Sequence, residues 1–254
     1  MTEPLLKATS LSKRFGGLLA VNGVSLSLYK DQLHAVIGPN GAGKTTLTHL
    51  LSGDLSATSG ELWLKGQAVT TWPHHRLSLH GLGRSYQKTN VFLPLTVWEN
   101  LMLAAQAKDA LAPYNPLSWL GRADQQANVA QRADRALQLS GLAASKDKTA
   151  ATLSHGIQRQ LEIAMVLATV PDVLLLDEPL AGMGAAEAET MVALLQTLKK
   201  DHAMLLIEHD MDAVFALADV LTVMVNGTVI ASGTPESIRS DAKVQAAYLG
   251  EGTA

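Results

Sequence analysis

The chain has 254 residues, a formal net charge of −3 and no cysteine; 47% of its residues are hydrophobic and 17% are charged. This length and apolar content allow one large folded domain and exclude wholesale disorder. The lack of cysteine excludes disulfides, thiolate metal sites and cysteine nucleophiles, and the charge, without a long basic run, gives no general attraction to nucleic acid.

The amino terminus carries an acid and a proline, at Glu3 and Pro4, and leads into no apolar signal core. No apolar run approaches the roughly 20 residues that a membrane-spanning helix requires. The sequence therefore predicts a protein that is soluble by itself, and any attachment to a membrane is expected to depend on a partner.

The first predicted elements precede a glycine-rich segment. Apolar and polar residues alternate over 24–29, which predicts a strand with one buried face. Upstream of it, Phe15 is followed by two glycines. An aromatic residue there fits stacking on a nucleotide base and fits packing in the core equally well, so the spacing alone leaves both interpretations open.

The glycine-rich segment lies between a predicted strand over 32–37 and a predicted helix over 46–51. Glycines leave no Cβ in the way, so successive backbone N–H groups can close around a polyphosphate. Lys44 can reach the β- and γ-phosphates, and the Thr45 hydroxyl can bind Mg²⁺. The pattern therefore predicts a phosphate-binding loop at the start of a helix. The residues expected to contact the nucleotide are Gly38, Pro39, Asn40, Gly41, Ala42, Gly43, Lys44, Thr45 and Thr46.

The middle of the chain changes character. A second alternating strand is predicted over 61–66. Thr96 and Glu99 have the spacing of a capping box, which predicts a helix that begins near Val97. From 108 to about 151 the pattern is helical and polar, and it predicts a separate helical lobe.

A buried strand and two acids follow this lobe. The apolar stripe over 157–168 predicts a helix, and the aliphatic run over 173–176 predicts a central strand of a parallel sheet. That strand ends in Asp177 and Glu178, at the edge where ligands bind in open α/β sheets. An acid that binds Mg²⁺ and a neighbour that orients water are what nucleotide hydrolysis requires, although a solvated strand end has the same composition.

The last part of the chain predicts a further helix over 191–198 and a buried strand over 203–207, followed by His209. By itself this histidine reads as a surface or capping residue. Asn-Gly at 226–227 between two apolar runs predicts a hairpin, and Thr234 before a proline predicts the start of a final helix.

In this order the motifs resemble the nucleotide-binding subunit of ATP-binding cassette (ABC) transporters, over nearly the whole chain. Residues 38–46 match the Walker A motif and 173–177 match Walker B. Gln87 matches the glutamine of the Q-loop, and Leu-Ser-His-Gly-Ile over 153–157 matches the family signature. The resemblance implies an ATP hydrolase of the α/β class. Its P-loop NTPase (RecA-like) core has a mostly parallel central sheet, with an N-terminal antiparallel β subdomain and a helical subdomain that carries the signature.

The resemblance also implies how the chain is divided. It implies a single ABC ATPase domain over 1–254, with the nucleotide-binding core in 1–90 and 152–254 and the helical signature lobe over about 91–170. The core includes the C-terminal hairpin and helix.

The resemblance assigns roles to single residues. Phe15 matches the aromatic that stacks on adenine, and Val21 is expected in the same pocket. The other nucleotide contacts are those of the glycine-rich segment. The implied catalytic residues are Lys44, Gln87, Glu178 as the base and His209 at the γ-phosphate, and the implied Mg²⁺ ligands are Thr45, Gln87 and Asp177.

The resemblance implies partners as well. Ser154 and Gly156 match the donors to the γ-phosphate of an ATP molecule held by a second ABC ATPase subunit, so a homo- or heterodimer completes each site. Transmembrane permease subunits and, indirectly, a periplasmic or extracellular substrate-binding protein are expected. These partners imply a peripheral position at the cytoplasmic face of the inner membrane.

Departures from the family pattern concern the coupling between the two sites. His155 and Ile157 replace a glycine and a glutamine of the common signature, while the phosphate-facing pair remains. Gly184 stands where an aspartate usually communicates between the sites. These changes put the coupling in doubt, and ATP binding is expected to be intact.

Three features resemble the branch that imports hydrophobic amino acids, specifically the longer of its two ATPase subunits. They are the helical insert between Gln87 and Ser154, the run over 207–211 and the segments 233–236 and 247–251. The resemblance implies ATP-driven import of branched-chain or other hydrophobic amino acids. Urea and short-chain amide importers and the lipopolysaccharide-exporter ATPase share these features, and the cargo is selected by partners.

Other classes share some of the motifs. Soluble ABC ATPases of translation usually carry two cassettes and those of DNA maintenance a long coiled coil, and the sequence has neither feature. A P-loop GTPase or kinase shares the loop alone, and the chain has no Asn-Lys-x-Asp motif for guanine. A catalytically silent subunit stays open as an alternative.

Overall fold

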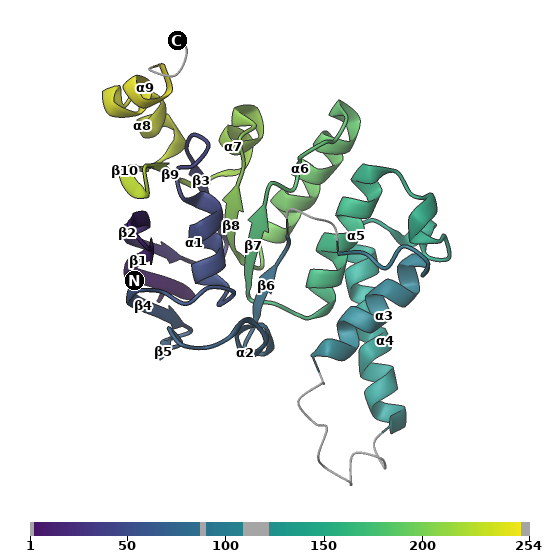
Figure 1. Ribbon diagram of the computed structural model, residues 1–254. Helices are drawn as coiled ribbons and strands as arrows, with labels where there is room; N and C mark the ends of the chain where they lie inside the picture. Colours follow the sequence, from purple (N-terminus) through teal and green to yellow (C-terminus); the bar gives the residue numbers. More distant parts are fainter. Residues whose placement is uncertain (1–2, 87–89, 109–121, 250–254) are drawn as a thin grey trace.

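The computed structural model describes residues 3–86, 90–108 and 122–249, and its strands form a four-stranded and a six-stranded sheet (Figure 1). The strands are β1 (Leu6–Phe15), β2 (Leu18–Leu28), β3 (Gln32–Ile37), β4 (Ser59–Leu64), β5 (Gln67–Ala68), β6 (Leu82–Arg84), β7 (Val173–Asp177), β8 (Ala203–Ile207), β9 (Val220–Val225) and β10 (Thr228–Gly233). The helices are α1 (Lys44–Leu51), α2 (His74–Leu79), α3 (Val97–Ala107), α4 (Arg122–Leu139), α5 (His155–Ala168), α6 (Ala185–Lys199), α7 (Met211–Leu217), α8 (Pro235–Arg239) and α9 (Ala242–Leu249).

The two sheets differ in strand direction. The smaller sheet has the order β2-β1-β4-β5 and is antiparallel throughout. The larger has the order β10-β9-β3-β8-β7-β6, and its neighbouring strands are parallel except for the β9–β10 hairpin. The predicted fold class, a mostly parallel sheet with an N-terminal antiparallel β subdomain, is confirmed.

The aliphatic run of β7 is explained by burial on both of its faces. Val173 and Leu175 lie in one hydrophobic cluster, together with residues of α1 and the small sheet. Leu174 and Leu176 point the other way, into a second cluster formed with the helices. All four are 0% exposed. Since successive side chains of a strand point to opposite faces, a strand between two cores has no place for a polar residue until it ends.

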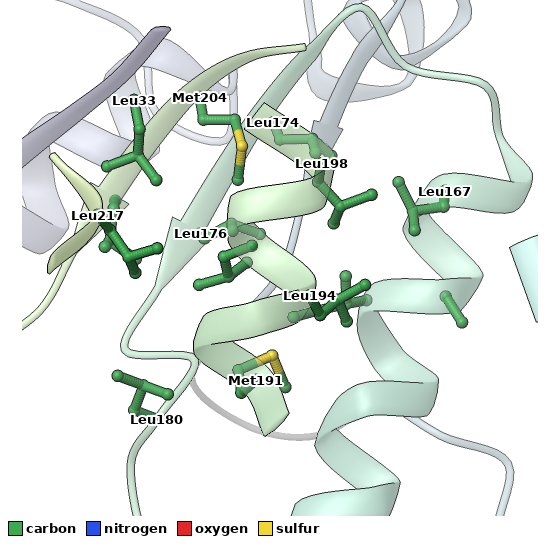
Figure 2. Packing of buried hydrophobic residues seen from close by; sticks show 14 of the residues in the cluster. Leu33, Leu167, Leu174, Leu176, Leu180, Met191, Leu194, Leu198, Met204 and Leu217 are labelled. Atoms are coloured by element: carbon green, nitrogen blue, oxygen red, sulfur yellow. The ribbon is translucent and has the colours of Figure 1, made fainter. Parts of the chain in front are cut away.

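The second cluster joins the sheet to the helices on its other face (Figure 2). Met191, Leu194 and Leu198 lie on one side of α6, three and four residues apart, and pack toward β7 and α5. Each such side chain contributes about 1.5–3 kcal/mol when it is fully buried. The apolar residues that recur about every 3.6 positions in the sequence are therefore the residues of α6 that face the core.

Helix α3 begins where the capping box predicts. The Thr96 hydroxyl accepts a hydrogen bond from the Glu99 N–H at 3.2 Å, and the Glu99 carboxylate accepts one from the Thr96 N–H at 2.7 Å. Helix α3 starts at the next residue and packs with α4 and α5. Across the described ranges, no helix combines the length and apolar character needed to span a bilayer.

The end of the chain differs from the prediction of one final helix. Thr234 caps a helix as expected, but α8 ends at Arg239 and a second helix, α9, follows. The Asp241 carboxylate accepts hydrogen bonds from the N–H groups of Lys243 and Val244, at 2.7 and 3.3 Å. A side chain that caps free N–H groups in this way starts a new helix.

One buried histidine predicts a pH dependence of stability. His34 in β3 is 5% exposed, and its Nε2 lies 2.7 Å from the Thr222 hydroxyl oxygen. Burial lowers the pKa of His34 from 6.5 to about 4. Because the folded-state pKa lies below the unfolded value, this stabilisation is complete above pH 6.5 and is lost as the pH falls through 4. We expect the free energy of unfolding to fall by up to about 3 kcal/mol between pH 7 and pH 4 from this group.

Urea denaturation of the wild type and His34→Gln across this pH range measures the effect. The variant cannot titrate at this position, so its stability should fall less steeply than that of the wild type. Identical slopes would assign the pH dependence to the carboxyl groups instead.

Candidate functional site

The site lies where three neighbouring strands of the larger sheet end. The glycine-rich loop (residues 38–46) follows β3, Asp177 and Glu178 end β7, and His209 follows β8. Strand β8 lies between β3 and β7, and these strands are parallel. Their carboxyl ends therefore meet at one edge of the sheet, where ligands bind in such folds.

A cavity of about 710 Å³ opens at this edge. The glycine-rich loop forms one wall of it, and Glu178 also lines it. The remaining walls come from the small sheet and from the β9–β10 turn. The lining residues outside the loop are Phe15, Leu18, Leu19, Ala20, Glu178, Asn226 and Gly227, and those of the loop are Asn40, Gly41, Ala42, Gly43, Lys44, Thr45 and Thr46.

Lys44 is held at the wall of the cavity by its own loop. Its ammonium group donates hydrogen bonds to the carbonyls of Gly38, at 2.5 Å, and Pro39, at 3.0 Å. Burial lowers the pKa of Lys44, while the carboxylates of Glu178 and Asp177 act in the opposite direction. The charges of all three side chains therefore act on one another in this site.

Two glycines of the loop are required by close contacts. Gly43 has a φ of 99°, and a Cβ on it would collide with the Ala20 carbonyl oxygen. Gly38 has a φ of 154°, and a Cβ there would collide with the Met224 carbonyl oxygen. The small sheet and the β9 strand thus press the loop into the shape that its composition allows.

The turn of the C-terminal hairpin packs on the loop. The Gly227 N–H donates to the Ala42 carbonyl at 3.0 Å, and the Gly227 carbonyl accepts from the Asn22 N–H at 2.8 Å. The hairpin itself was predicted, but its contact with the cavity was not. No local pattern in the sequence indicates a contact between residues so far apart in the chain.

The two residues predicted from the resemblance to form the adenine pocket, Phe15 and Val21, lie in different environments. Phe15, at the end of β1, is 47% exposed and lines the cavity, with the Lys13 ammonium 5.2 Å from its ring centroid. Val21 is 0% exposed and lies in the core. Val21 does not line the cavity as expected, because its side chain packs in the core; Leu18, Leu19 and Ala20 line the cavity instead.

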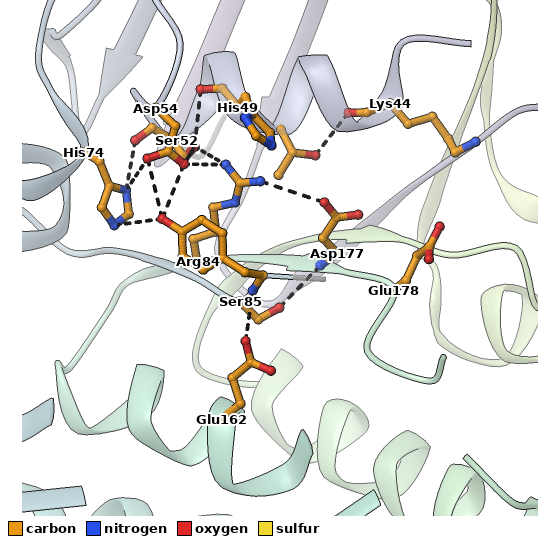
Figure 3. A network of polar contacts seen from close by, with 12 residues as sticks. Lys44, His49, Ser52, Asp54, His74, Arg84, Ser85, Glu162, Asp177 and Glu178 are labelled. Carbon is orange, nitrogen blue, oxygen red and sulfur yellow. Dashed lines mark hydrogen bonds and ion pairs between the residues drawn. The ribbon is translucent and has the colours of Figure 1, made fainter. Parts of the chain in front are cut away.

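Asp177 is buried against Arg84, a residue that none of the recognised sequence motifs includes (Figure 3). The Arg84 guanidinium, 1% exposed, lies 3.8 Å from the Asp177 carboxylate. It also donates hydrogen bonds to Asp54, at 2.5 Å, and to the Ser52 hydroxyl, at 2.6 Å. Burial raises the pKa of Asp177, and the charge of Arg84 opposes this.

The donors at this edge fit a magnesium ion. Within the described ranges there is no group of three or more His, Cys, Asp or Glu side chains that could hold a metal by themselves. Mg²⁺ takes hard oxygen ligands, usually one or two protein carboxylates with waters and substrate phosphates. The Thr45 hydroxyl and the Asp177 carboxylate are donors of this kind. Gln87, the third predicted ligand, lies outside the described residues.

Glu178 and His209 lie close to each other. Nδ1 of His209 is 3.9 Å from the Glu178 carboxylate and 3.8 Å from that of Glu208. Glu208 is 1% exposed and accepts hydrogen bonds from the N–H groups of Leu180, at 2.8 Å, and His209, at 3.1 Å. It therefore joins the loop after β7 to the end of β8, a role that its place in the sequence did not reveal.

The predicted signature residues lie at the start of α5. Ser154 caps this helix by accepting a hydrogen bond from the Ile157 N–H at 3.4 Å. Its hydroxyl donates to the Glu187 carboxylate at 2.6 Å. The same carboxylate covers Gly156 so closely that a Cβ there would overlap it. Neither Ser154 nor Gly156 is among the described residues that line the cavity.

The departures from the common pattern lie beside this contact. Gly184 is the residue before α6 and caps it without a side-chain hydrogen bond. His155 lies next to Gly182, 3.5 Å from where a Cβ would stand. The structure thus places His155, a residue of the signature, against the loop that follows Glu178.

Comparison with known proteins agrees with this geometry. The family model for ABC transporters matches residues 21–181, and the model for the branched-chain amino acid ATP-binding cassette transporter matches residues 228–254. The high-affinity branched-chain amino acid transport ATP-binding protein LivG of Escherichia coli (strain K12) is 40% identical, an alignment that covers 99% of this chain and 100% of that protein. BraF of Pseudomonas aeruginosa, with the same description, is 39% identical over the same shares.

A solved structure extends the comparison to three dimensions. The crystal structure of the ADP conformation of an ATP-binding cassette of an ABC transporter has a TM-score of 0.83 and 31% identity, and the match covers 98% of this chain and 100% of that one. Sequence, family model and fold agree over nearly the full length. The chain therefore belongs to the ABC transporter family, as one of its ATP-binding subunits.

Proposed function

We propose that this chain binds and hydrolyses ATP to drive an importer of branched-chain or other hydrophobic amino acids. The observation that carries the proposal is the cavity that joins the glycine-rich loop, with Lys44, to Glu178. A loop of closely spaced backbone N–H groups with one cation suits a polyphosphate, and a carboxylate that lines the same cavity suits a water nucleophile. LivG and BraF, two branched-chain amino acid transport proteins, supply the class of cargo.

In this proposal the loop N–H groups and Lys44 bind the β- and γ-phosphates, and Phe15 stacks on the adenine. Mg²⁺, when bound by Thr45, Asp177 and Gln87, neutralises phosphate charge. Glu178 orients the attacking water and accepts its proton, and His209 contacts the γ-phosphate. Groups that are already in place thus stabilise the negative charge that develops on the phosphoryl oxygens in the transition state.

A second ATPase subunit completes the site in this proposal. Ser154 and Gly156 lie at the start of a 14-residue helix, where N–H groups and the helix dipole favour an anion. Because they do not line the cavity of their own chain, the ATP that they bind is held by the partner. The conformational change of the two ATPase subunits is passed to the permease subunits at the cytoplasmic face of the inner membrane. A substrate-binding protein delivers the cargo.

Purification in mild detergent of the tagged chain from its own cells tests this assignment. Co-purification of multi-span membrane proteins and a second ATPase subunit is the expected result. A ligand screen of the matching binding protein should then select an aliphatic amino acid over urea and short amides. Recovery with soluble partners alone would contradict a role in transport.

The hydrogen bond from Ser154 to Glu187 predicts that the Glu187 carboxylate competes with the γ-phosphate for Ser154. A carboxylate that occupies the signature repels the γ-phosphate that the partner must bring, so Glu187→Gln should lower the ATP concentration for half-maximal turnover. We expect about a threefold to tenfold decrease, since one charge interaction near a surface is worth about 1 kcal/mol. Steady-state ATPase titrations measure it, with Glu189→Gln on the exposed face of α6 as the matched control. An unchanged or higher half-maximal concentration would contradict the competition.

A further inference from the structure

A buried arginine of α5 contacts two segments of the chain outside its own helix. Arg159 is 2% exposed and lies in the interior between α5, β6 and β7. One nitrogen of its guanidinium, Nη2, donates hydrogen bonds to the carbonyls of Asp177, at 3.2 Å, and Glu178, at 3.0 Å. The other, Nη1, donates to the carbonyl of Tyr86, at 2.6 Å.

A buried acid completes this arrangement. Glu162, one turn further along α5, accepts a hydrogen bond from Arg159 at 2.7 Å through one oxygen. Through its other oxygen it accepts one from the Tyr86 N–H at 3.1 Å. Both polar groups of the Tyr86 backbone are therefore held by a charged pair that starts on α5. Such charge-assisted bonds are about twice as strong as neutral ones.

The carbonyl that Arg159 holds belongs to a strained residue. Glu178 has a φ of 48°, in the left-handed region that residues other than glycine rarely adopt. A backbone of this kind costs about 1–3 kcal/mol and persists when its surroundings fix it. Three hydrogen bonds hold it here: the Glu178 N–H donates to the Ile207 carbonyl at 2.9 Å, and the Glu178 carbonyl accepts from the Ala181 N–H at 3.2 Å and from Arg159 at 3.0 Å.

We propose that Arg159 is a positioning residue for hydrolysis, which holds the left-handed backbone of Glu178 so that its carboxylate points into the cavity. The proposal rests on the proposed ATPase function of this site. Arg159 does not line the cavity, so it acts through Glu178 and not on the nucleotide. Because the same guanidinium holds Tyr86, it also fixes the segment that leads to Gln87.

The position of Arg159 on α5 gives this contact a second consequence. Ser154 caps the same helix, five residues before Arg159 along the chain. The signature, the start of the segment after β6 and the backbone of the catalytic carboxylate are thereby held together by one helix and one side chain. A displacement of α5 must move all three or break these bonds.

Lysine cannot replace this arginine. The guanidinium is a planar fork whose two ends donate in different directions, here to β7 on one side and to Tyr86 on the other. An ammonium group is a point charge that can serve one end at a time. Arg159→Lys should therefore keep the buried charge and lose the geometry.

Single-turnover and steady-state ATPase assays of the full-length chain, purified together with its second ATPase subunit, test the proposal with Arg159→Lys and Arg159→Met. We expect kcat to fall by about 10- to 100-fold, as for a misplacement of a catalytic group by about 1 Å, while the Kd for ATP stays within about threefold. The control is Arg132→Met, since Arg132 is also an arginine of the helical lobe but donates to Ala105 at 3.1 Å. It should keep wild-type turnover.

A double-mutant cycle separates positioning from a general structural effect. If Arg159 acts through Glu178, then Arg159→Lys added to Glu178→Gln should leave the residual rate unchanged within about twofold. Full additivity of the two losses, or wild-type kcat in Arg159→Lys, would overturn the proposal.

A crystal structure of Arg159→Lys gives a readout that does not depend on activity. The expected result is that residue 178 leaves the left-handed region or that its carboxylate leaves the cavity wall. An unchanged residue 178 would overturn the proposal even if the wild-type chain proved to have no ATPase activity. A wild type without turnover, by contrast, would overturn the proposed function, so the two failures are distinguishable.

Discussion

Glu178→Gln should bind ATP with wild-type affinity and lose its turnover by about 10²- to 10⁴-fold, the range for removal of a general base. The amide keeps the size of the side chain and its place at the cavity wall, but it cannot accept a proton from water. Lys44, which binds the phosphates in our proposal, is unchanged in this variant. Binding and hydrolysis should therefore separate.

Steady-state phosphate release and equilibrium nucleotide binding measure the two effects on the same preparation. Glu189→Gln, an exposed acid of α6, is the matched control and should turn over normally. Retained turnover in Glu178→Gln would remove this residue from the role of base. A wild-type chain that binds ATP without any turnover would instead favour the catalytically silent subunit.

Lys44→Ala should weaken ATP binding itself, by about 10- to 100-fold. The ammonium group is held at the cavity wall by the carbonyls of Gly38 and Pro39, so little conformational entropy is lost when a phosphate replaces them as its partner. One charge-assisted hydrogen bond contributes about 1.5–3 kcal/mol, which gives this range of affinity. Loss of the cation also leaves Asp177 and Glu178 without its compensating charge.

Calorimetric titration of ATP into the variant measures this Kd directly. Lys30→Ala, in the exposed turn between β2 and β3, removes an equal charge away from the cavity and should bind ATP as the wild type does. Equal affinities for Lys44→Ala and the wild type would show that the loop N–H groups alone hold the phosphates. The role proposed for Lys44 would then be wrong.

The features predicted best are those written in short segments. The Thr96 capping box, the aliphatic run of β7 and the hairpin turn at 226–227 each depend on residues within a few positions of one another, and all are confirmed. The order of motifs was also sufficient for the ABC family, which the comparisons confirm. The short spacing between the residues of each motif determines its local hydrogen bonds, and the folded chain keeps these bonds.

The features missed are contacts between distant segments. Arg84 and Glu208 are buried polar residues that contact distant segments, at Asp177 and Leu180 respectively, and no motif in the sequence indicates these contacts. The resemblance implied that Val21 lines the nucleotide pocket, but its side chain packs in the core. The direction in which a single side chain points depends on strand register and on packing, and the sequence alone gives neither.

The pairing of β3 has a consequence for how the chain is made. This strand carries the glycine-rich loop at its end, yet it is hydrogen-bonded to β8 and β9, with Gln32 paired to Ala203. At a synthesis rate of about 5–20 residues per second, the first half of the site waits roughly 10–35 s for the strands that hold it in place. A nascent chain on the ribosome therefore carries its nucleotide motif early but acquires a stable nucleotide site only near the end of translation.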